Sequence, residues 1–126
     1  MELKTHKKYN KKFGEIVELK ENFAKVKLKT TSDMAVDKEG LVHGGFTFSA
    51  ADFCAMAAVN EPYVVLAKSS STFLAPVKVG DVVEFEGKVI QQEGKKYKVE
   101  VKAKVRDKEV YKGEFTCVNL PKHILN

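Results

Sequence analysis

An acidic side chain sits in the middle of the most apolar segment of the chain. Residues 46–59 read FTFSAADFCAMAAV, and Asp52 is the only acidic or basic residue among them. Burying an ionised carboxylate without partners costs several kcal/mol, so a core helix would ordinarily carry alanine or leucine there. Asp52 therefore has a hydrogen-bonded structural role, an exposed position or a role in chemistry. Buried carboxyl groups tend to have raised pKa values, which suits a general base.

A second feature lies just before this segment, where Gly40 to Gly45 read GLVHGG. Glycine lets a ligand approach the backbone closely. The first amides of a helix have no internal partner and carry a partial positive charge. Such amides can bind the oxyanion that develops during acyl transfer. The same pair of glycines also fits a tight turn into a helix with no ligand.

The spacing of these two features has a consequence for assembly. Gly44 and Asp52 are eight residues apart, which is about 12 Å along a helix. One reacting carbon atom cannot touch both groups of the same chain. A site that uses both would take Gly44 from one subunit and Asp52 from another, which predicts a homodimer or a dimer of dimers.

The surrounding pattern predicts one helix and six strands. We expect a helix over residues 44–59, rich in alanine and ending before Pro62 with Asn60 as its cap. From Tyr97 onward apolar residues alternate with charged ones, as in a half-buried antiparallel strand. Residues 31–40 are polar and predict a loop. Strands are expected at about 13–19, 24–30, 64–75, 81–91, 97–106 and 109–119, with turns at 21–22, 92–95 and 107–108.

This order of elements predicts how the helix is buried. A lone helix as apolar as residues 44–59 must be covered, and a strongly curved antiparallel sheet wrapped around it is the simple solution. That arrangement is the α+β hot-dog fold. The length of 126 residues predicts one such domain over 1–126.

The bulk composition indicates an ordinary soluble protein. The net charge of +5 is compatible with nucleic-acid binding, but the lysines mostly alternate with apolar residues along strands. We therefore assign Lys98, Lys102 and Lys104 to the solvent-exposed face of a sheet. No nucleic-acid partner is expected. A mild positive field also suits a phosphate-rich ligand such as coenzyme A.

The N-terminus and the apolar segment give no targeting or membrane signal. Residues 1–8 carry charge with no apolar run behind them, unlike a signal peptide. The stretch 46–59 is too short to span a bilayer. We therefore expect a cytoplasmic protein with no membrane partner.

The cysteines and histidines indicate neither a disulfide framework nor a metal site. Cys54 and Cys117 both lie in apolar or strand-like contexts, which is typical of reduced core thiols. The histidines are far apart in sequence and form no zinc motif. Neither a metal nor another cofactor is expected.

The segment from Gly40 to Gly45, with an acidic residue nine positions after His43, resembles the PaaI-like acyl-CoA thioesterases of the phenylacetic-acid-pathway type. The resemblance covers about residues 37–80, including FLAPVKVGD at 73–81, and the strand order extends it over most of the chain. It implies that the Gly44 amide polarises the thioester carbonyl. It also implies that Asp52 activates water or attacks directly, and that His43 shapes the loop.

The resemblance has one departure and one open choice. The family usually has asparagine six residues before the histidine, where this chain has Asp37, which accepts hydrogen bonds but cannot donate them. Family members often carry serine or threonine on the strand after the helix. Ser69, Ser70, Ser71 and Thr72 lie in that region. Ser70 and Ser71 are on opposite faces, so only one of these two can point inward. Asp37, Gly45 and these two serines are the candidates for substrate binding.

The sequence therefore predicts an acyl-CoA thioesterase for a small, medium-chain or aromatic acyl group. Three alternatives remain: a non-catalytic acyl-CoA-binding sensor or carrier, a dehydratase acting on acyl thioesters, and chemistry through Cys54. A dehydratase would need a different Asp/His arrangement, and apolar neighbours do not activate Cys54. Five apolar residues could line an acyl pocket or belong to the core: Phe46, Phe48, Phe53, Met56 and Phe73.

Overall fold

The helix that carries Asp52 is the centre of the structure, a computed structural model that describes residues 1–126. Helix α1 runs over Gly44–Val59, as the sequence predicts. It ends at Asn60, which adopts the left-handed conformation (φ 51°, ψ 48°) and donates its backbone N–H to Met56. Asparagine tolerates this conformation better than most residues, so the predicted cap is confirmed.

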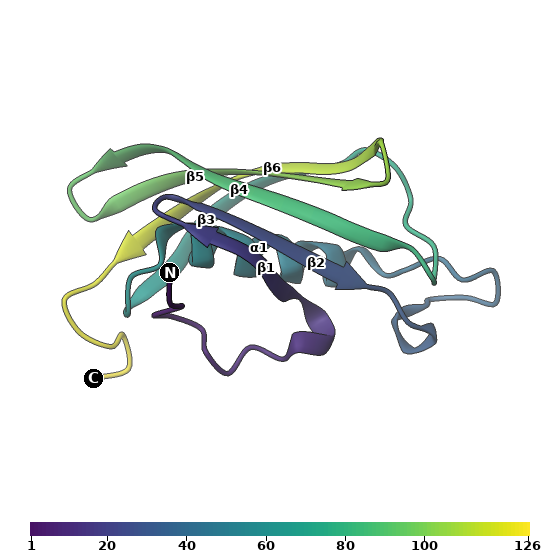
Figure 1. The fold of residues 1–126 in the computed structure, drawn as a ribbon, viewed down its shortest axis with the longest axis horizontal. Helices are drawn as coiled ribbons and strands as arrows, with labels where there is room; N and C mark the ends of the chain where they lie inside the picture. Colours follow the sequence, from purple (N-terminus) through teal and green to yellow (C-terminus); the bar gives the residue numbers. More distant parts are fainter.

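Six strands form one antiparallel sheet around this helix (Figure 1). Their order across the sheet is β1-β2-β4-β5-β6-β3, so β1 and β3 lie at the edges. The predicted α+β hot-dog architecture is confirmed, with strand ends within two residues of those expected. The strands are β1 (Glu15–Lys20), β2 (Phe23–Lys29), β3 (Val64–Phe73), β4 (Val82–Glu93), β5 (Lys96–Val105) and β6 (Lys108–Asn119). Short 3-10 helices cover Lys11–Phe13 (η1) and Ser32–Met34 (η2).

Two predicted turns are slightly wrong. The ladder between β4 and β5 continues to Glu93 opposite Lys96, so Gly94 and Lys95 alone form that turn. The turn before β6 is Arg106–Asp107, one residue earlier than expected, because Arg106 takes a positive φ of 55° and reverses the chain there.

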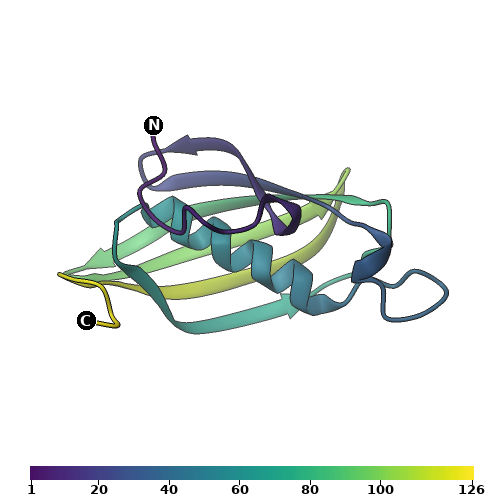
Figure 2. The ribbon, with the colours of Figure 1, turned by 90° about the horizontal axis from the view of Figure 1, so that it is seen from below.

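Helix α1 lies in the concave face of the sheet, as Figures 1 and 2 show from two directions. Ten of its sixteen residues are buried, many of them alanine. These small side chains let the helix backbone approach the sheet: a Cβ atom on Gly87 of β4 would lie only 3.0 Å from the Sγ atom of Cys54. No helix of the structure is long and apolar enough to cross a lipid bilayer.

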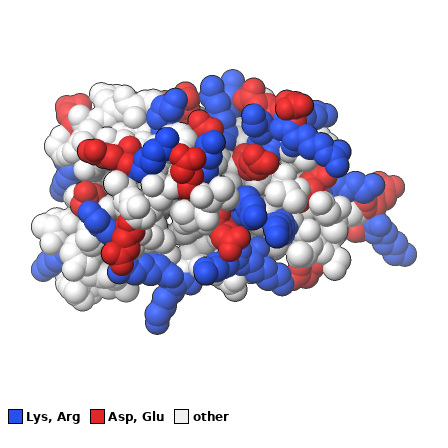
Figure 3. Space-filling model, viewed as in Figure 1, with Lys and Arg blue, Asp and Glu red and all other residues white.

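The outer face of the sheet is charged with both signs. Lys102 and Lys104 are exposed there and Lys98 is half-buried, as the alternation predicts. Lys98 pairs with Glu114 at 3.6 Å, and Lys102 with Glu100 at 3.9 Å. Figure 3 shows lysines and acidic residues interspersed over the visible face. The lysines on this sheet therefore do not form a patch of one sign.

Residues 1–14, here called the N-terminal strap, cross the side of α1 that is turned away from the sheet (Figure 2). The Tyr9 ring stacks on Phe53 with centroids 4.3 Å apart. At the far end of the helix, the Asn60 side chain accepts from the Lys4 amide at 2.7 Å and donates to the Glu2 carbonyl at 2.9 Å. The sequence pattern assigned no structure to this segment.

Asn60 is expected to hold the strap to the helix. The Asn60→Gly variant keeps the left-handed cap but loses both side-chain hydrogen bonds, so we expect a loss of about 1–2 kcal/mol in the free energy of unfolding. Asn60→Ala should lose about 1 kcal/mol more, because alanine is strained at positive φ. Urea denaturation of the two variants checks this. Wild-type stability in Asn60→Gly would contradict it.

Candidate active site

The first turn of α1 leaves one backbone amide without a partner. His43 precedes the helix in an extended conformation, and its Nδ1 atom accepts the Gly45 amide at 2.7 Å. A neutral ring that accepts at Nδ1 carries its proton on Nε2. The Gly44 amide makes no hydrogen bond within the chain. Gly44 therefore presents a free N–H at the positive end of the helix.

Gly45 has a different function from Gly44 in this structure. A Cβ atom at position 45 would lie 2.8 Å from Nδ1 and 3.0 Å from Cε1 of His43. Only glycine therefore lets the His43 ring fold back as a cap. The Gly45 amide, assigned from the sequence to substrate binding, is occupied by this cap.

The loop before the helix is tied to its surroundings by the backbone. The His43 amide donates to the Met34 carbonyl at 2.9 Å, and the Val42 amide to the Val77 carbonyl at 2.9 Å. The Asp37 carboxylate accepts the amides of Glu39 at 3.0 Å and Leu41 at 3.2 Å. Asp37, also assigned to substrate binding, is exposed and bonds to its own loop.

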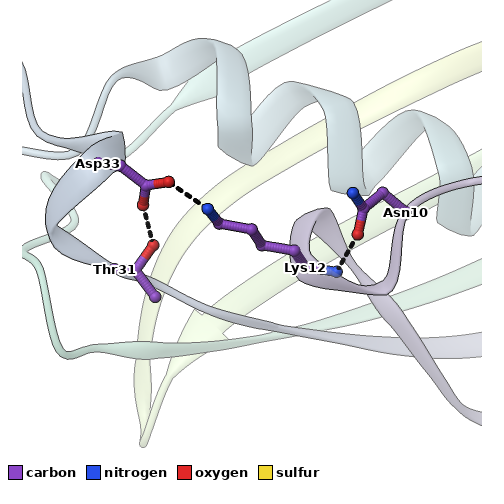
Figure 4. Close-up of polar contacts among 4 residues, drawn as sticks. All are labelled: Asn10, Lys12, Thr31 and Asp33. Carbon is purple, nitrogen blue, oxygen red and sulfur yellow. Dashed lines mark hydrogen bonds and ion pairs between the residues drawn. The ribbon is translucent and has the colours of Figure 1, made fainter.

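The strap is joined to this loop by charge (Figure 4). The Lys12 ammonium bonds to the Asp33 carboxylate, which also accepts from the Thr31 hydroxyl. The contact with Lys12, and then that with Thr31, holds the pKa of Asp33 below its ordinary value. The Asn10 side chain accepts the Lys12 amide at 2.9 Å. The strap and the helix entrance are thereby fixed to each other.

Asp52 lies on the part of α1 that is not fully covered. Its Oδ1 atom is buried and has no hydrogen-bond partner. Burial raises the pKa of Asp52 to about 6, which brings it into the range useful for a general base. Asp52 takes part in none of the ion pairs of the structure. Asp52 and Gly44 share one helix, so about 12 Å separate them along its axis.

Hydroxyl groups from β3 and β6 gather near this carboxylate. Ser71 lies 2.6 Å from the hydroxyl of Tyr111 and 3.0 Å from that of Ser69. Ser70 is exposed on the opposite face of β3, so of the two predicted serines Ser71 is the one that points inward. Burial raises the pKa of Tyr111, and the charge of Asp52 adds to the effect. The sequence pattern included Ser69 among the hydroxyl residues of this strand but did not point to Tyr111.

Two hollows flank the N-terminus of α1. One, of about 400 Å³, lies beside the strap. The other, of about 380 Å³, reaches the Gly44 backbone and is mostly apolar. A larger hollow of about 630 Å³ lies on the charged outer face of the sheet and contains none of the groups described above. The first is lined by Phe13, His43, Gly45, Phe46 and Ser49, and the second includes Gly44, Thr47, Phe73, Leu74, Pro76 and Val110.

The five apolar residues proposed for an acyl pocket divide between these hollows and the core. Phe46 lines the first hollow and Phe73, which is 52% exposed, lines the second. Phe53 and Met56 are core residues with 5% and 0% exposure. Phe48 is half-buried and packs on Phe115.

The cysteines are core residues, as expected. Cys54 and Cys117 are both free and buried. Burial raises the pKa of the Cys54 thiol strongly, and it raises that of Cys117 to about 12. Neither thiol ionises near neutral pH, so neither is an activated nucleophile.

Comparison with known families decides the class of the protein. The family model of the thioesterase superfamily matches residues 39–112, which include α1, β3, β4, β5 and the beginning of β6. The chain belongs to the thioesterase superfamily. The family resemblance read from residues 40–52 is thereby confirmed.

Relatives of this thioesterase-superfamily chain carry diverse names. The chain is 47% identical to the uncharacterised protein PH1136 of Pyrococcus horikoshii, and the two structures superpose with a TM-score of 0.99. The match covers 100% of this chain and 98% of PH1136. The chain is 46% identical over 121 residues to methylthioribose-1-phosphate isomerase of Aquifex aeolicus. It is 34% identical over 113 residues to the transcription factor FapR of Caldanaerobacter subterraneus subsp. tengcongensis. These matches take in 95% and 89% of this chain, but only 26% of the isomerase and 56% of FapR.

More distant structures share the fold. The PaaI protein of E. coli superposes with a TM-score of 0.80 at 23% identity, over 87% of this chain and 81% of its own. A hypothetical thioesterase of Streptococcus pneumoniae, solved with coenzyme A, superposes with a TM-score of 0.78 at 21% identity, over 87% and 88%. The PaaI-like hot-dog fold is therefore shared by this superfamily member.

The unpaired Asp52 carboxyl should lower stability when it ionises. The folded state raises its pKa from 3.8 to about 6. The folded protein therefore binds this proton more tightly than the unfolded chain does. The Asp52 contribution to stability should fall as the pH rises from about 4 to about 6, and stay constant above that.

Asp52→Asn is expected to be more stable than wild type at pH 8 by about 1–2 kcal/mol, because it removes the buried charge. The gain should vanish near pH 4. Thermal and urea unfolding at several pH values measure the difference, with Asp107→Asn, in an exposed turn, as the matched control. A variant less stable than wild type at pH 8 would show that the carboxylate has a stabilising partner.

Proposed function

We propose that this protein is an acyl-CoA thioesterase whose site combines Asp52 of one subunit with Gly44 of another. The observation that carries the proposal is the buried Oδ1 atom of Asp52, which has no partner within the chain. A polar atom left unpaired at such a cost is typical of a group that meets its partner during function. The free Gly44 amide is the complementary feature.

The proposed mechanism uses both groups on the thioester. The carbonyl oxygen accepts a hydrogen bond from the Gly44 amide, and the positive end of α1 stabilises the charge that develops on it. Asp52 removes a proton from a water molecule whose oxygen attacks the carbonyl carbon. The C–S bond then breaks, and the leaving thiolate takes the proton back from Asp52. Direct attack by Asp52, through a transient anhydride, is the variant of this mechanism.

The separation of the two groups supports a site between subunits. About 12 Å of helix lies between Gly44 and Asp52, so a thioester cannot bridge them within one chain. Strand β3 is an edge strand with only β6 beside it, and its outer backbone groups are free to pair with a second copy. Self-association as a homodimer or a dimer of dimers would supply the second half of each site.

Coenzyme A is the proposed carrier of the acyl group. The pneumococcal thioesterase of the same fold was solved with coenzyme A, which supports a thioester of that class. The two hollows beside Gly44, of about 380 and 400 Å³, suit a small, medium-chain or aromatic acyl group and the pantetheine arm. The reaction as proposed needs no metal, other cofactor, nucleic acid or membrane, and we assign it to the cytoplasm.

A second function, binding of acyl-CoA without hydrolysis, is favoured by the likeness to FapR. That relative is named a transcription factor, and the chain matches just over half of its length. A domain of this kind therefore serves a protein whose named role is not enzymatic. A binding protein would be stabilised against heat by acyl-CoA and would leave the thioester intact.

Turnover is expected to depend on Asp52. Wild-type protein should release free thiol from at least one of a panel of short, medium-chain and aromatic acyl-CoAs. The Asp52→Asn variant should lose about 10²–10⁴-fold in kcat, because a general base is removed. Asp107→Asn should keep wild-type activity. If every acyl-CoA stays intact and acyl-CoA raises the Tm, the result contradicts the thioesterase proposal and supports the acyl-CoA-binding function.

The rate should rise with pH as Asp52 loses its proton. The base acts only when ionised, so kcat/KM should increase through about pH 6, the pKa to which burial raises Asp52. Tyr9, Tyr111 and Cys117 lie close enough to feel its charge, but their pKa values are raised further above neutrality. A profile already flat from pH 4 to 7 would contradict the role of Asp52 as the base.

A further inference from the structure

A glycine in the interior of β6 breaks the rule that strand interiors avoid this residue. Gly113 lies between two paired strands, opposite Ser71 of β3 and Val101 of β5. A Cβ atom there would lie 2.5 Å from the hydroxyl oxygen of Tyr111. Gly113 therefore provides the space in which the Tyr111 hydroxyl lies.

The Tyr111 hydroxyl uses this space to reach β3. Tyr111 is fully buried, with its ring held edge-on by Phe73 at 5.2 Å. Its oxygen lies 2.6 Å from that of Ser71, which lies 3.0 Å from that of Ser69. Three hydroxyls thus form a chain along the inner face of β3.

The chain runs toward Asp52. Ser69 pairs with Phe115 of β6, and Phe115 packs on Phe48 at a centroid distance of 5.7 Å. Phe48 is one helical turn before Asp52, so the two side chains share a face of α1. These contacts link Ser69 to the face of α1 that carries Asp52. The charge of Asp52 also contributes to the raised pKa of Tyr111, which is consistent with this placement.

The acidity of the three groups sets the direction of the hydrogen bonds. Either oxygen of each pair can donate, and because a phenol is a stronger acid than an aliphatic alcohol, we assign Tyr111 as the donor to Ser71. Ser71 then donates its own proton to Ser69. The proton of Ser69 remains available for a group beside Asp52.

We propose that Tyr111 is a positioning residue of the thioesterase reaction, which orients Ser71 and Ser69 so that a serine hydroxyl donates to the water molecule attacking the thioester. This inference rests on the proposed function. Ser69 holds the water oxygen while Asp52 takes the water proton, so the hydroxyl chain itself undergoes no net proton transfer. Tyr111 does not touch the substrate and acts through the two serines, since both Ser71 and Ser69 lie close enough to lower its pKa by hydrogen bonding.

The test is the Tyr111→Phe variant of the full chain, assayed by thiol release from the best acyl-CoA of the wild type. Removing the hydroxyl leaves the ring in place but frees Ser71 and Ser69 to reverse their hydrogen bonds. We expect kcat to fall about tenfold with KM within about twofold of wild type, as for the loss of one hydrogen bond in the transition state. Tyr97→Phe is the matched control, since Tyr97 is also buried and its hydroxyl accepts only from Gln92.

A double-mutant cycle separates this role from a merely structural one. Ser71→Ala, at a half-buried position, breaks the same chain and should lose as much kcat as Tyr111→Phe. The double variant should lose less kcat than the product of the two single losses, because Tyr111 and Ser71 act in the same group of hydroxyls. Wild-type kcat in Tyr111→Phe, a change in KM alone, or losses that multiply in the double variant would each overturn the proposal. If Tyr111→Phe does not fold, unchanged kcat in Ser71→Ala overturns it as well.

The two proposals fail in different ways. A wild type that hydrolyses no acyl-CoA contradicts the thioesterase function, and the role of Tyr111 falls with it. A wild type that is active and depends on Asp52, but not on Tyr111 or Ser71, contradicts this inference alone.

Discussion

Keeping a carboxylate unpaired inside an apolar helix is the constraint on which the rest of the structure depends. Asp52 has a buried oxygen without a partner, and desolvation alone raises its pKa to about 6. The core has to tolerate the cost of burying this group. It does so with a helix of small residues held closely against a continuous antiparallel sheet, which buries ten of the sixteen helix residues. The stability of that core is what allows a reactive group at its margin.

The loop at the N-terminus of α1 is held by a small number of specific contacts. His43 caps the Gly45 amide, Gly45 makes room for the His43 ring, and the loop is tied to Met34 and Val77. These contacts leave the Gly44 amide without a hydrogen-bond partner in the chain. The free donor and the free carboxylate therefore lie at two fixed points on one rigid helix. A rigid helix cannot bring them together, which is why we propose that a second copy of the chain completes the site.

The sequence predicted those parts of the fold that depend on local pattern. Alanine content and Asn60 marked α1, and strict alternation marked β5, because both signals repeat within a few residues. The sequence pattern did not predict the strap because its contacts with α1 join residues more than forty positions apart, such as Tyr9 with Phe53 and Lys4 with Asn60. Tyr111 and Ser71 are likewise forty positions apart. The one local signal for them was Gly113, a glycine in the interior of a strand.

The most direct test of the site between subunits is the activity of a defined heterodimer. One subunit carries Asp52→Asn. The other carries Gly44→Pro, which removes the amide donor at a helix position where proline is tolerated. Both homodimers should be inactive, whereas the heterodimer, isolated through two different tags, should recover about half of the wild-type kcat per dimer, because one of its two equivalent sites is intact. An inactive heterodimer would show that Gly44 and Asp52 act within one chain, or not together at all.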